Sequence, residues 1–157
     1  MPDSLVSVGE KAPDFELPRD GGGTLSLRDF AGKTLVLFFY PKDNTSGCTK
    51  EAIAFTGLER DFAKIGSVVV GASKDTVAKH DKFRDKHGLT IPLLSDSEGD
   101  LCERFGVWVE KKMYGKTYMG IERSTFLIDG QGVIRHIWRK VKVPGHAEEV
   151  LDMAKTL

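Results

Sequence analysis

The residues from Thr34 to Tyr40, TLVLFFY, form an unbroken apolar run that is rich in β-branched and aromatic side chains. A run this short, followed at once by Pro41, is typical of a strand that is buried on both faces. Such a strand lies inside a sheet that is covered on both sides. The run therefore favours a layered α/β fold over an all-helical one.

A helix and a second strand follow this run. After the turn PKDNTSG, apolar residues recur at helical steps of three, four and three, and Gly66 ends the pattern. The residues in that pattern are Phe55, Leu58, Phe62 and Ile65. SVVVGAS (67–73) then predicts another buried strand, and residues 75–87 predict a polar amphipathic helix that ends at Gly88. Strands joined by crossover helices run parallel, so we expect a partly parallel sheet with helices on both faces.

The remaining segments predict shorter elements. They are an N-terminal β-hairpin extension from DFELP (14–18) and TLSLRDF (24–30), a strand at 89–95, a helix at 99–107, a hairpin at 124–139 and a closing helix at 146–157. No repeat, low-complexity tract or linker interrupts them. We therefore expect a single domain over residues 1–157, with a mixed central sheet flanked by helices.

Composition argues against several classes of function. Lys+Arg and Asp+Glu both total 23, so the chain lacks the basic excess that nucleic acid or an anionic membrane favours. No apolar run approaches the roughly 18 residues of a membrane span. Residues 1–11, MPDSLVSVGEK, lack the basic and apolar regions of an export signal. We therefore expect a cytoplasmic protein with reduced thiols and no nucleic-acid or membrane partner.

Cys48 is one of only two cysteines, and it follows the turn instead of lying inside the apolar run. If a helix begins near Ser46, the sulfur lies in its first turn, where free N–H groups and the helix dipole favour a thiolate. Gly47 lets the backbone approach closely, and Pro41 shapes the turn without an unsatisfied N–H. Because the sequence neighbours are small or polar, we expect a reactive thiol presented to solvent instead of a buried structural cysteine.

The segment PKDNTSGCTKEA resembles the peroxidatic loop of peroxiredoxins, whose pattern is Pro-x-x-x-Thr/Ser-x-x-Cys. Pro41, Thr45 and Cys48 occupy its three positions. The resemblance covers nearly the whole chain, including APDFELP near the start and GIERSTFLID at 120–129. It is closest to the bacterioferritin comigratory protein, or peroxiredoxin Q, subfamily. This resemblance implies a thioredoxin-like fold, which agrees with the mixed sheet above, a monomer, and no metal, flavin or haem cofactor.

The resemblance also implies a reaction. The Cys48 thiolate would attack hydrogen peroxide or an organic hydroperoxide and become a sulfenic acid. Arg123 matches the arginine that completes the family's site, although by itself it reads as a surface charge before a buried strand. Thr45 and the N–H groups of Gly47 and Cys48 would bind the peroxide oxygens.

Two further residues have supporting roles under this reading. Pro41 would cover the sulfur and exclude water and bulky oxidants. Glu51, one helical turn after Cys48, would hold the arginine in place. For Glu51 an exposed helix charge is an equally good interpretation.

Reduction of the sulfenic acid is where the sequence departs from the subfamily pattern. Ile53 and Arg84 occupy the positions where members of the subfamily carry a second, resolving cysteine. Only Cys102 remains, and its neighbours Leu101 and Phe105 favour a core role. Three routes stay open: direct reduction by thioredoxin, glutaredoxin or a low-molecular-weight thiol, a disulfide with Cys102 after unfolding, and an intermolecular disulfide. We favour the first route, a one-cysteine cycle.

Other thiol chemistries fit the pattern less well. A thioredoxin-type exchanger needs Cys-x-x-Cys, but Thr45 and Glu51 lie three residues to either side of Cys48. A cysteine phosphatase needs an arginine six residues after the cysteine, where this chain has Ala54. The non-enzymatic alternative is a peroxide-responsive redox sensor or holdase that signals through Cys48 oxidation.

The four histidines predict no site of their own. A thiol hydrolase would pair its cysteine with histidine, but His136 and His146 lie far along the chain in no motif of that kind. His80 and His87 are seven residues apart on one predicted helix, and we expect them to face solvent instead of forming a metal site.

Overall fold

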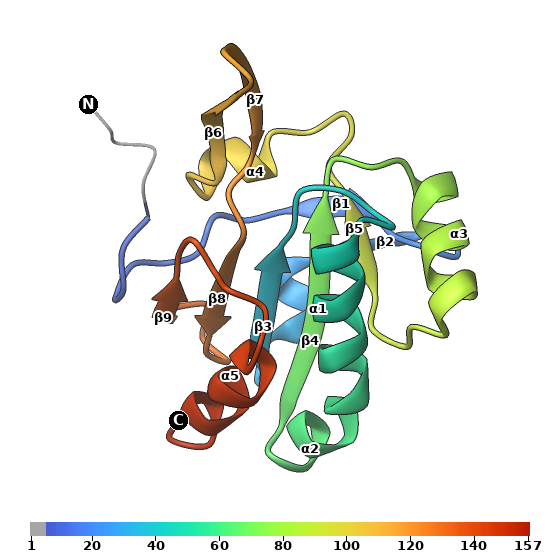
Figure 1. The fold of residues 1–157 in the computed structure, drawn as a ribbon. Coiled ribbons are helices and arrows are strands. Elements are labelled where there is room, and N and C mark those ends of the chain that lie inside the picture. The colour runs from blue at the N-terminus through green and yellow to red at the C-terminus, as the bar shows by residue number, and fades with distance from the viewer. Residues whose placement is uncertain (1–5) are drawn as a thin grey trace.

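The structure, a computed structural model, describes residues 6–157 (Figure 1). The first five residues, which begin the segment in which we find no export signal, lie outside the described residues. Among residues 6–157, no helix is both long and apolar enough to cross a membrane.

A five-stranded mixed sheet forms the centre of the molecule, in the order β5-β4-β3-β8-β9. The strands are β3 (Thr34–Phe39), β4 (Ser67–Ser73), β5 (Leu93–Ser95), β8 (Ser124–Ile128) and β9 (Ile134–Trp138). β3, β4 and β5 run parallel, whereas β8 is antiparallel to both β3 and β9. The prediction of a mixed sheet with a parallel part and a closing hairpin is confirmed.

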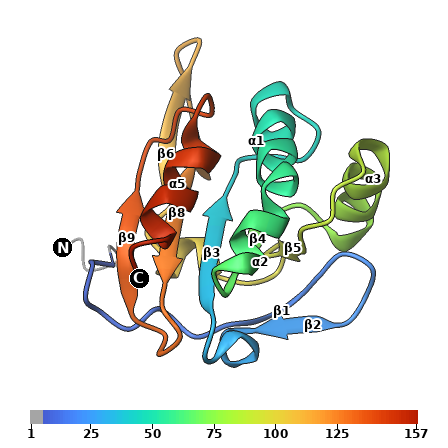
Figure 2. The same ribbon diagram turned by 90° about the horizontal axis from the view of Figure 1, so that it is seen from below.

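Helices cover both faces of this sheet, and Figure 2 shows those on one face. One face carries α1 (Ser46–Gly57), α2 (Glu59–Lys64), α3 (Val77–His87) and α5 (His146–Ala154). The other face carries α4 (Leu101–Arg104), the 3-10 helix η1 (Leu27–Phe30) and the N-terminal segment, whose β1 (Glu16–Pro18) and β2 (Thr24–Ser26) form the predicted hairpin.

Two hydrophobic cores follow from the alternation of side chains along β3. Leu35, Leu37 and Phe39 point into the core under α4 and η1, whereas Val36 and Phe38 point into the core under α1 and α5. The run TLVLFFY is therefore apolar throughout because it supplies both cores at once. The two cores matter for the site because each contains one of the two cysteines.

The strand expected at 89–95 is confined to Leu93–Ser95, the helix expected at 99–107 to Leu101–Arg104, and residues 27–30 form η1 instead of continuing a strand. Two larger features also differ from the sequence prediction. The helix expected up to residue 65 is interrupted at Leu58, because Gly57 is a poor helix former and the chain turns there before α2 begins. A hairpin of β6 (Trp108–Met113) and β7 (Lys116–Ile121) was not predicted. Its turn, Tyr114–Gly115, has positive φ at both residues, which suits a two-residue hairpin.

Candidate active site

Cys48 lies where the sequence predicts it, in the first turn of α1. β3 ends at Phe39, and Thr45 takes the N-cap position with an extended backbone. The helix then begins at Ser46, so the positive end of its dipole and its unpaired N–H groups lie beside the cysteine.

The prediction that the sulfur is presented to solvent is wrong. Cys48 is 0% exposed and belongs to the core under α1 and α5. The physical reason is helical geometry. Cys48, Ala52 and Phe55 are spaced at four and three residues, so they share the face of α1 that packs on the sheet. Its polar sequence neighbours point outward instead. Their polarity therefore misled the prediction, whereas the 48–52–55 spacing would have predicted burial.

Arg123, between β7 and β8, joins Cys48 to Glu51. Its Nη2 donates to the Cys48 sulfur over 3.4 Å, and its Nη1 donates to Glu51 Oε1 over 2.7 Å. Glu51 is 1% exposed on its side chain and Arg123 is 17% exposed, so the ion pair is largely buried. The structure thus brings together three of the residues that the sequence singles out. Glu51 is not the exposed helix charge of the alternative interpretation.

Gly47 has a steric role in this arrangement. A Cβ atom at residue 47 would lie 3.1 Å from Arg123 Nη2, closer than ordinary van der Waals contact. Because Glu51 and the sulfur both hold the guanidinium, it has little freedom to move aside. Glycine is therefore the residue that lets the arginine approach the helix start.

Thr45 and Pro41 flank the loop that leads to the cysteine. Thr45 is exposed, and its Oγ1 donates to the Lys42 carbonyl over 3.0 Å, which leaves the oxygen's lone pairs free to accept. Pro41 is half-buried immediately after β3 and Tyr40. Both residues are thus at the cysteine-bearing end of the sheet, on the same short loop.

Lys111 is a neighbour that the sequence analysis missed, because it lies on the unpredicted hairpin. It is half-buried, and its side chain crosses Gly120 on β7 so closely that a Cβ atom added there would lie 3.3 Å from Lys111 Cδ. Burial and the positive charge of Arg123 lower the pKa of Lys111, whereas the charge of Cys48 opposes that change. A second cation therefore lies within electrostatic range of the sulfur.

Glu51 gives the site a pH dependence. Burial raises the pKa of Glu51 from 4.5 to about 7, although Arg123 opposes the change, and Oε2 has no hydrogen-bond partner among residues 6–157. A raised folded-state pKa means that the folded protein binds this proton more tightly than the unfolded chain. The resulting stabilisation is fully present below pH 4.5 and is lost as the pH rises through about 7.

We therefore expect Glu51→Gln, whose amide does not titrate, to lose less stability than the natural protein over this pH range. Over this pH range the unfolding free energy of the natural protein is expected to fall by up to about 3 kcal/mol more than that of Glu51→Gln. Urea denaturation of both proteins at several pH values between about 4.5 and 8 measures it. Parallel pH curves for the two proteins would show that the pKa of Glu51 is the same in the folded and unfolded states.

Comparison with known proteins defines the family. A model of the AhpC/TSA family matches residues 8–137. The chain belongs to the AhpC/TSA family. Among the relatives of this AhpC/TSA protein, peroxiredoxin Bcp of Bacillus subtilis is 51% identical over 152 residues, 97% of each chain. Peroxiredoxin Bcp of Escherichia coli is 41% identical over 150 residues, 96% of each chain.

Solved structures of peroxiredoxins are similar to this protein over most of the chain. Peroxiredoxin Q of Xanthomonas campestris superposes with a TM-score of 0.87 at 48% identity over 90% of each chain. A Xylella fastidiosa peroxiredoxin Q gives a TM-score of 0.92 at 44% identity over 96% of each chain. The resemblance to the Bcp or peroxiredoxin Q subfamily and the thioredoxin-like fold are confirmed. This AhpC/TSA protein is a peroxiredoxin, a thiol-dependent peroxidase.

The resolving positions of this peroxiredoxin carry no sulfur in the structure either. Ile53 is 47% exposed on α1, and Arg84 on α3 forms an ion pair with Asp20 at 3.1 Å. Cys102 is 0% exposed in the core on the opposite face of the sheet, as its apolar neighbours predict. Burial, helped by Asp96, raises the pKa of the Cys102 thiol far above its ordinary value. The sheet therefore separates the two cysteines.

The histidines lie differently from the prediction. His80 does not face solvent: its side chain is 0% exposed, because it lies on the face of α3 that packs on the sheet. His87 is half-buried, and its Nε2 is 3.0 Å from Asn44 Oδ1. His136 packs against Trp138 on β9, with ring centroids 4.2 Å apart. His146 is buried, and its Nε2 lies 2.7 Å from a threonine hydroxyl on β8.

Proposed function

We propose that this peroxiredoxin reduces hydrogen peroxide and organic hydroperoxides to water and alcohols through a sulfenic acid on Cys48. The observation that carries the proposal is the contact of 3.4 Å between Arg123 Nη2 and the Cys48 sulfur at the start of α1. A related structure, that of the Xanthomonas campestris bacterioferritin comigratory protein, concerns alkyl peroxide reduction by that protein; it has 47% identity and a TM-score of 0.86.

In the proposed step the Cys48 thiolate attacks the terminal oxygen of a hydroperoxide. An S–O bond forms as the O–O bond breaks, and the departing alkoxide or hydroxide takes a proton from water. Ionising an ordinary thiol completely at neutral pH gains only about 2 kcal/mol. Any larger acceleration must come from groups that bind the stretched O–O bond better than the intact one.

Arg123 is suited to that role. Its guanidinium donates several hydrogen bonds in a planar fork, so that one nitrogen remains on Glu51 while another faces the sulfur and the departing oxygen. Thr45 Oγ1 and the N–H groups of Gly47 and Cys48 would hold the peroxide. Pro41 would limit access of water. Because Glu51 already fixes the guanidinium, little reorganisation accompanies the reaction.

For the second half of the cycle we propose direct reduction by an external thiol. A thiol R′SH would displace water from the sulfenic acid to give a mixed disulfide, and a second thiol would release reduced Cys48 and a disulfide R′SSR′. Ile53 and Arg84 support this route because neither is a cysteine, and Cys102 supports it because it lies in the other core. Thioredoxin, glutaredoxin and low-molecular-weight thiols fit the requirement, and the chain would act as a monomer.

Mass spectrometry after one equivalent of hydrogen peroxide tests this cycle, with a 1,3-diketone present to trap sulfenic acid. We expect a single diketone adduct on Cys48, and the same adduct in Cys102→Ala. A 48–102 disulfide or a covalent dimer would overturn the one-cysteine route. A protein that remains reduced while free thiols in the same tube are oxidised would overturn the peroxidase proposal itself.

One observation supports the alternative of a redox sensor or holdase. The β6–β7 hairpin exposes a group of apolar side chains, as a surface for another protein would. They are Met113, Tyr114, Tyr118 and Met119. Turnover separates the two functions: an enzyme consumes many equivalents of peroxide when a thiol reductant is supplied, whereas a sensor is oxidised once.

A further inference from the structure

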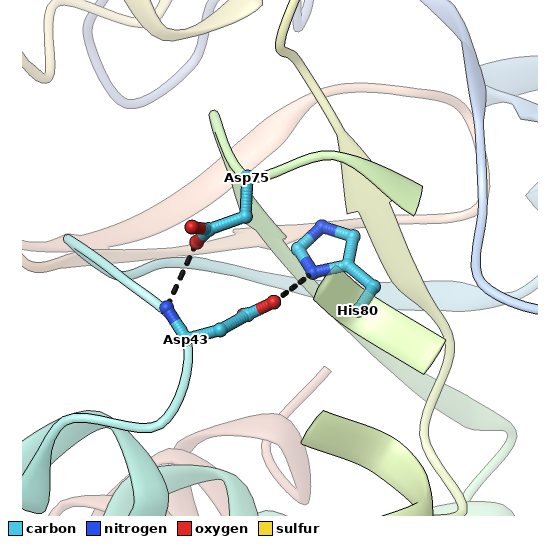
Figure 3. Close-up of side chains that lie close together, drawn as sticks. All are labelled: Asp43, Asp75 and His80. Carbon is cyan, nitrogen blue, oxygen red and sulfur yellow. Dashed lines mark hydrogen bonds and ion pairs between the residues drawn. The ribbon is translucent and has the colours of Figure 1, made fainter. Parts of the chain in front are cut away.

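Asp43 anchors the loop that leads from β3 to Cys48 (Figure 3). Its Oδ1 accepts from the Tyr40 hydroxyl over 2.6 Å, and its Oδ2 lies 2.7 Å from His80 Nδ1 on α3. Its backbone N–H donates to Asp75 Oδ2 over 2.8 Å. One loop residue is therefore tied to the residue that follows β3, to α3 and to the segment after β4.

The surroundings of His80 require a proton on both ring nitrogens. Nδ1 faces the Asp43 carboxylate, and Nε2 lies 2.8 Å from the Leu94 carbonyl, so each nitrogen faces an acceptor. The geometry is that of an imidazolium, which also leaves no lone pair for a metal ion. Burial opposes this charge, but the hydrogen bond and charge of Asp43, the Leu94 carbonyl and the charge of Asp75 raise the pKa of His80 above its ordinary value.

Other charged groups face the same cluster. Asp75 accepts from the Ser73 hydroxyl over 2.7 Å and so remains tied to β4. A cavity of about 240 Å³ adjoins Asp43 and Asp75. Four lysines also line this cavity: Lys42, Lys79, Lys82 and Lys86. The contact of 2.7 Å with the Asp43 carboxylate is the shortest interaction of the His80 ring.

We propose that His80 is a positioning residue for the peroxidase site. Through Asp43 it holds the loop 41–47 and the first turn of α1 closed, and loss of its proton releases them. The proposal rests on the proposed function, because it concerns access to Cys48. That sulfur is 0% exposed, so an external thiol reaches it only if this part of the chain opens.

The direction of the effect follows from the linkage between protonation and folding. When His80 loses its proton, the ionised Asp43 is left without a counter-ion at 9% exposure, although the Tyr40 hydroxyl still donates to it, and opening of the loop returns the carboxylate to water. Because the pKa of His80 is raised in the closed state, the closed state is favoured at low pH and weakens as the pH rises through that pKa. The closed form, which holds Arg123 against the sulfur, is the form that reacts once a small peroxide has entered, whereas the open form gives a bulkier thiol access to the sulfur.

Hydrogen exchange of the full, reduced chain tests the opening directly. After correction for the intrinsic pH dependence of exchange, we expect protection of peptides covering residues 41–50 to fall as His80 loses its proton. In His80→Gln, protection there is expected to be low at every pH, whereas peptides from α5 are unchanged. His136→Gln on β9 is the matched control and is expected to behave like the natural protein. Equal, pH-independent protection in all three proteins would overturn the proposal.

Kinetics provide the second readout. With the loop mostly open, we expect His80→Gln and Asp43→Asn to be oxidised by hydrogen peroxide at least about fivefold more slowly at slightly acidic pH, because only the closed fraction reacts. Asp43→Asn preserves side-chain volume and carries the test if His80→Gln fails to fold. Unchanged rates and unchanged exchange in both variants, with Cys48→Ser inactive, would overturn the role of His80 and leave the proposed function intact. If Cys48 is not oxidised in any variant, the proposed function fails, and the exchange data still decide the role of His80.

Discussion

Replacement of Cys48 by serine is expected to abolish peroxide reduction, whereas Cys102→Ala is expected to keep the rate within about twofold. A serine hydroxyl is not ionised near neutral pH and cannot form a sulfenic acid. Cys102 cannot substitute for Cys48, because it lies in the core on the far face of the sheet. Stopped-flow fluorescence of Trp108 and Trp138 after mixing with hydrogen peroxide measures the rate.

Cys102→Ala also serves as the control for stability, because it removes the other buried thiol from an equally buried position. Urea denaturation of all three proteins shows whether either variant is unfolded under the conditions of the assay. Peroxide consumption by folded Cys48→Ser, or loss of peroxide consumption in folded Cys102→Ala, would show that the assignment of the reaction to Cys48 is wrong.

Replacement of Arg123 by alanine is expected to slow oxidation of Cys48 at least about 100-fold, the effect of losing one charged donor from a preorganised site. Arg123→Lys keeps the charge but loses the planar guanidinium that donates to Glu51 and to the sulfur at the same time, so an intermediate rate is expected. The second-order rate constant for hydrogen peroxide measures both effects.

Loss of Arg123 also removes the cation that opposes the raised pKa of the buried Glu51 carboxyl, so that this group destabilises the fold at a pH where it must ionise. The double variant Arg123→Ala/Glu51→Gln removes the ionisable group and is expected to recover stability above neutral pH without recovering the rate. A double variant as fast as the natural protein would show that Arg123 has only a structural role. Glu51→Gln alone is the matched control and is expected to be slowed much less.

The sequence was sufficient for features that depend on local patterns. TLVLFFY predicts β3 because a strand buried on both faces has no polar position, and the start of α1 follows from the turn that precedes Cys48. Burial of the sulfur was not predicted, because it depends on which face of α1 meets the sheet. The β6–β7 hairpin was missed because most of its residues are exposed, so its alternation is weak.

Contacts between distant residues lay beyond local patterns. Arg123 and Glu51 are 72 residues apart, and only the resemblance to peroxiredoxins placed them together. His80 and Asp43, 37 residues apart, lie in no motif that the sequence analysis recognised. Their contact depends on how α3 packs beside the loop. A histidine in a polar helix gives no sign that both of its nitrogens will face buried acceptors.

The position of the two cysteines on opposite faces of the sheet has a kinetic consequence. The oxidising equivalent taken from a peroxide has no second thiol on the same face of the sheet to which it can pass, because Cys102, the other cysteine, lies in the opposite core. Under the one-cysteine cycle proposed above, completion of each catalytic round requires a collision with a reducing thiol. The steady-state velocity would then depend on the concentration of reducing thiols around the protein, and their supply would limit the rate of the whole cycle.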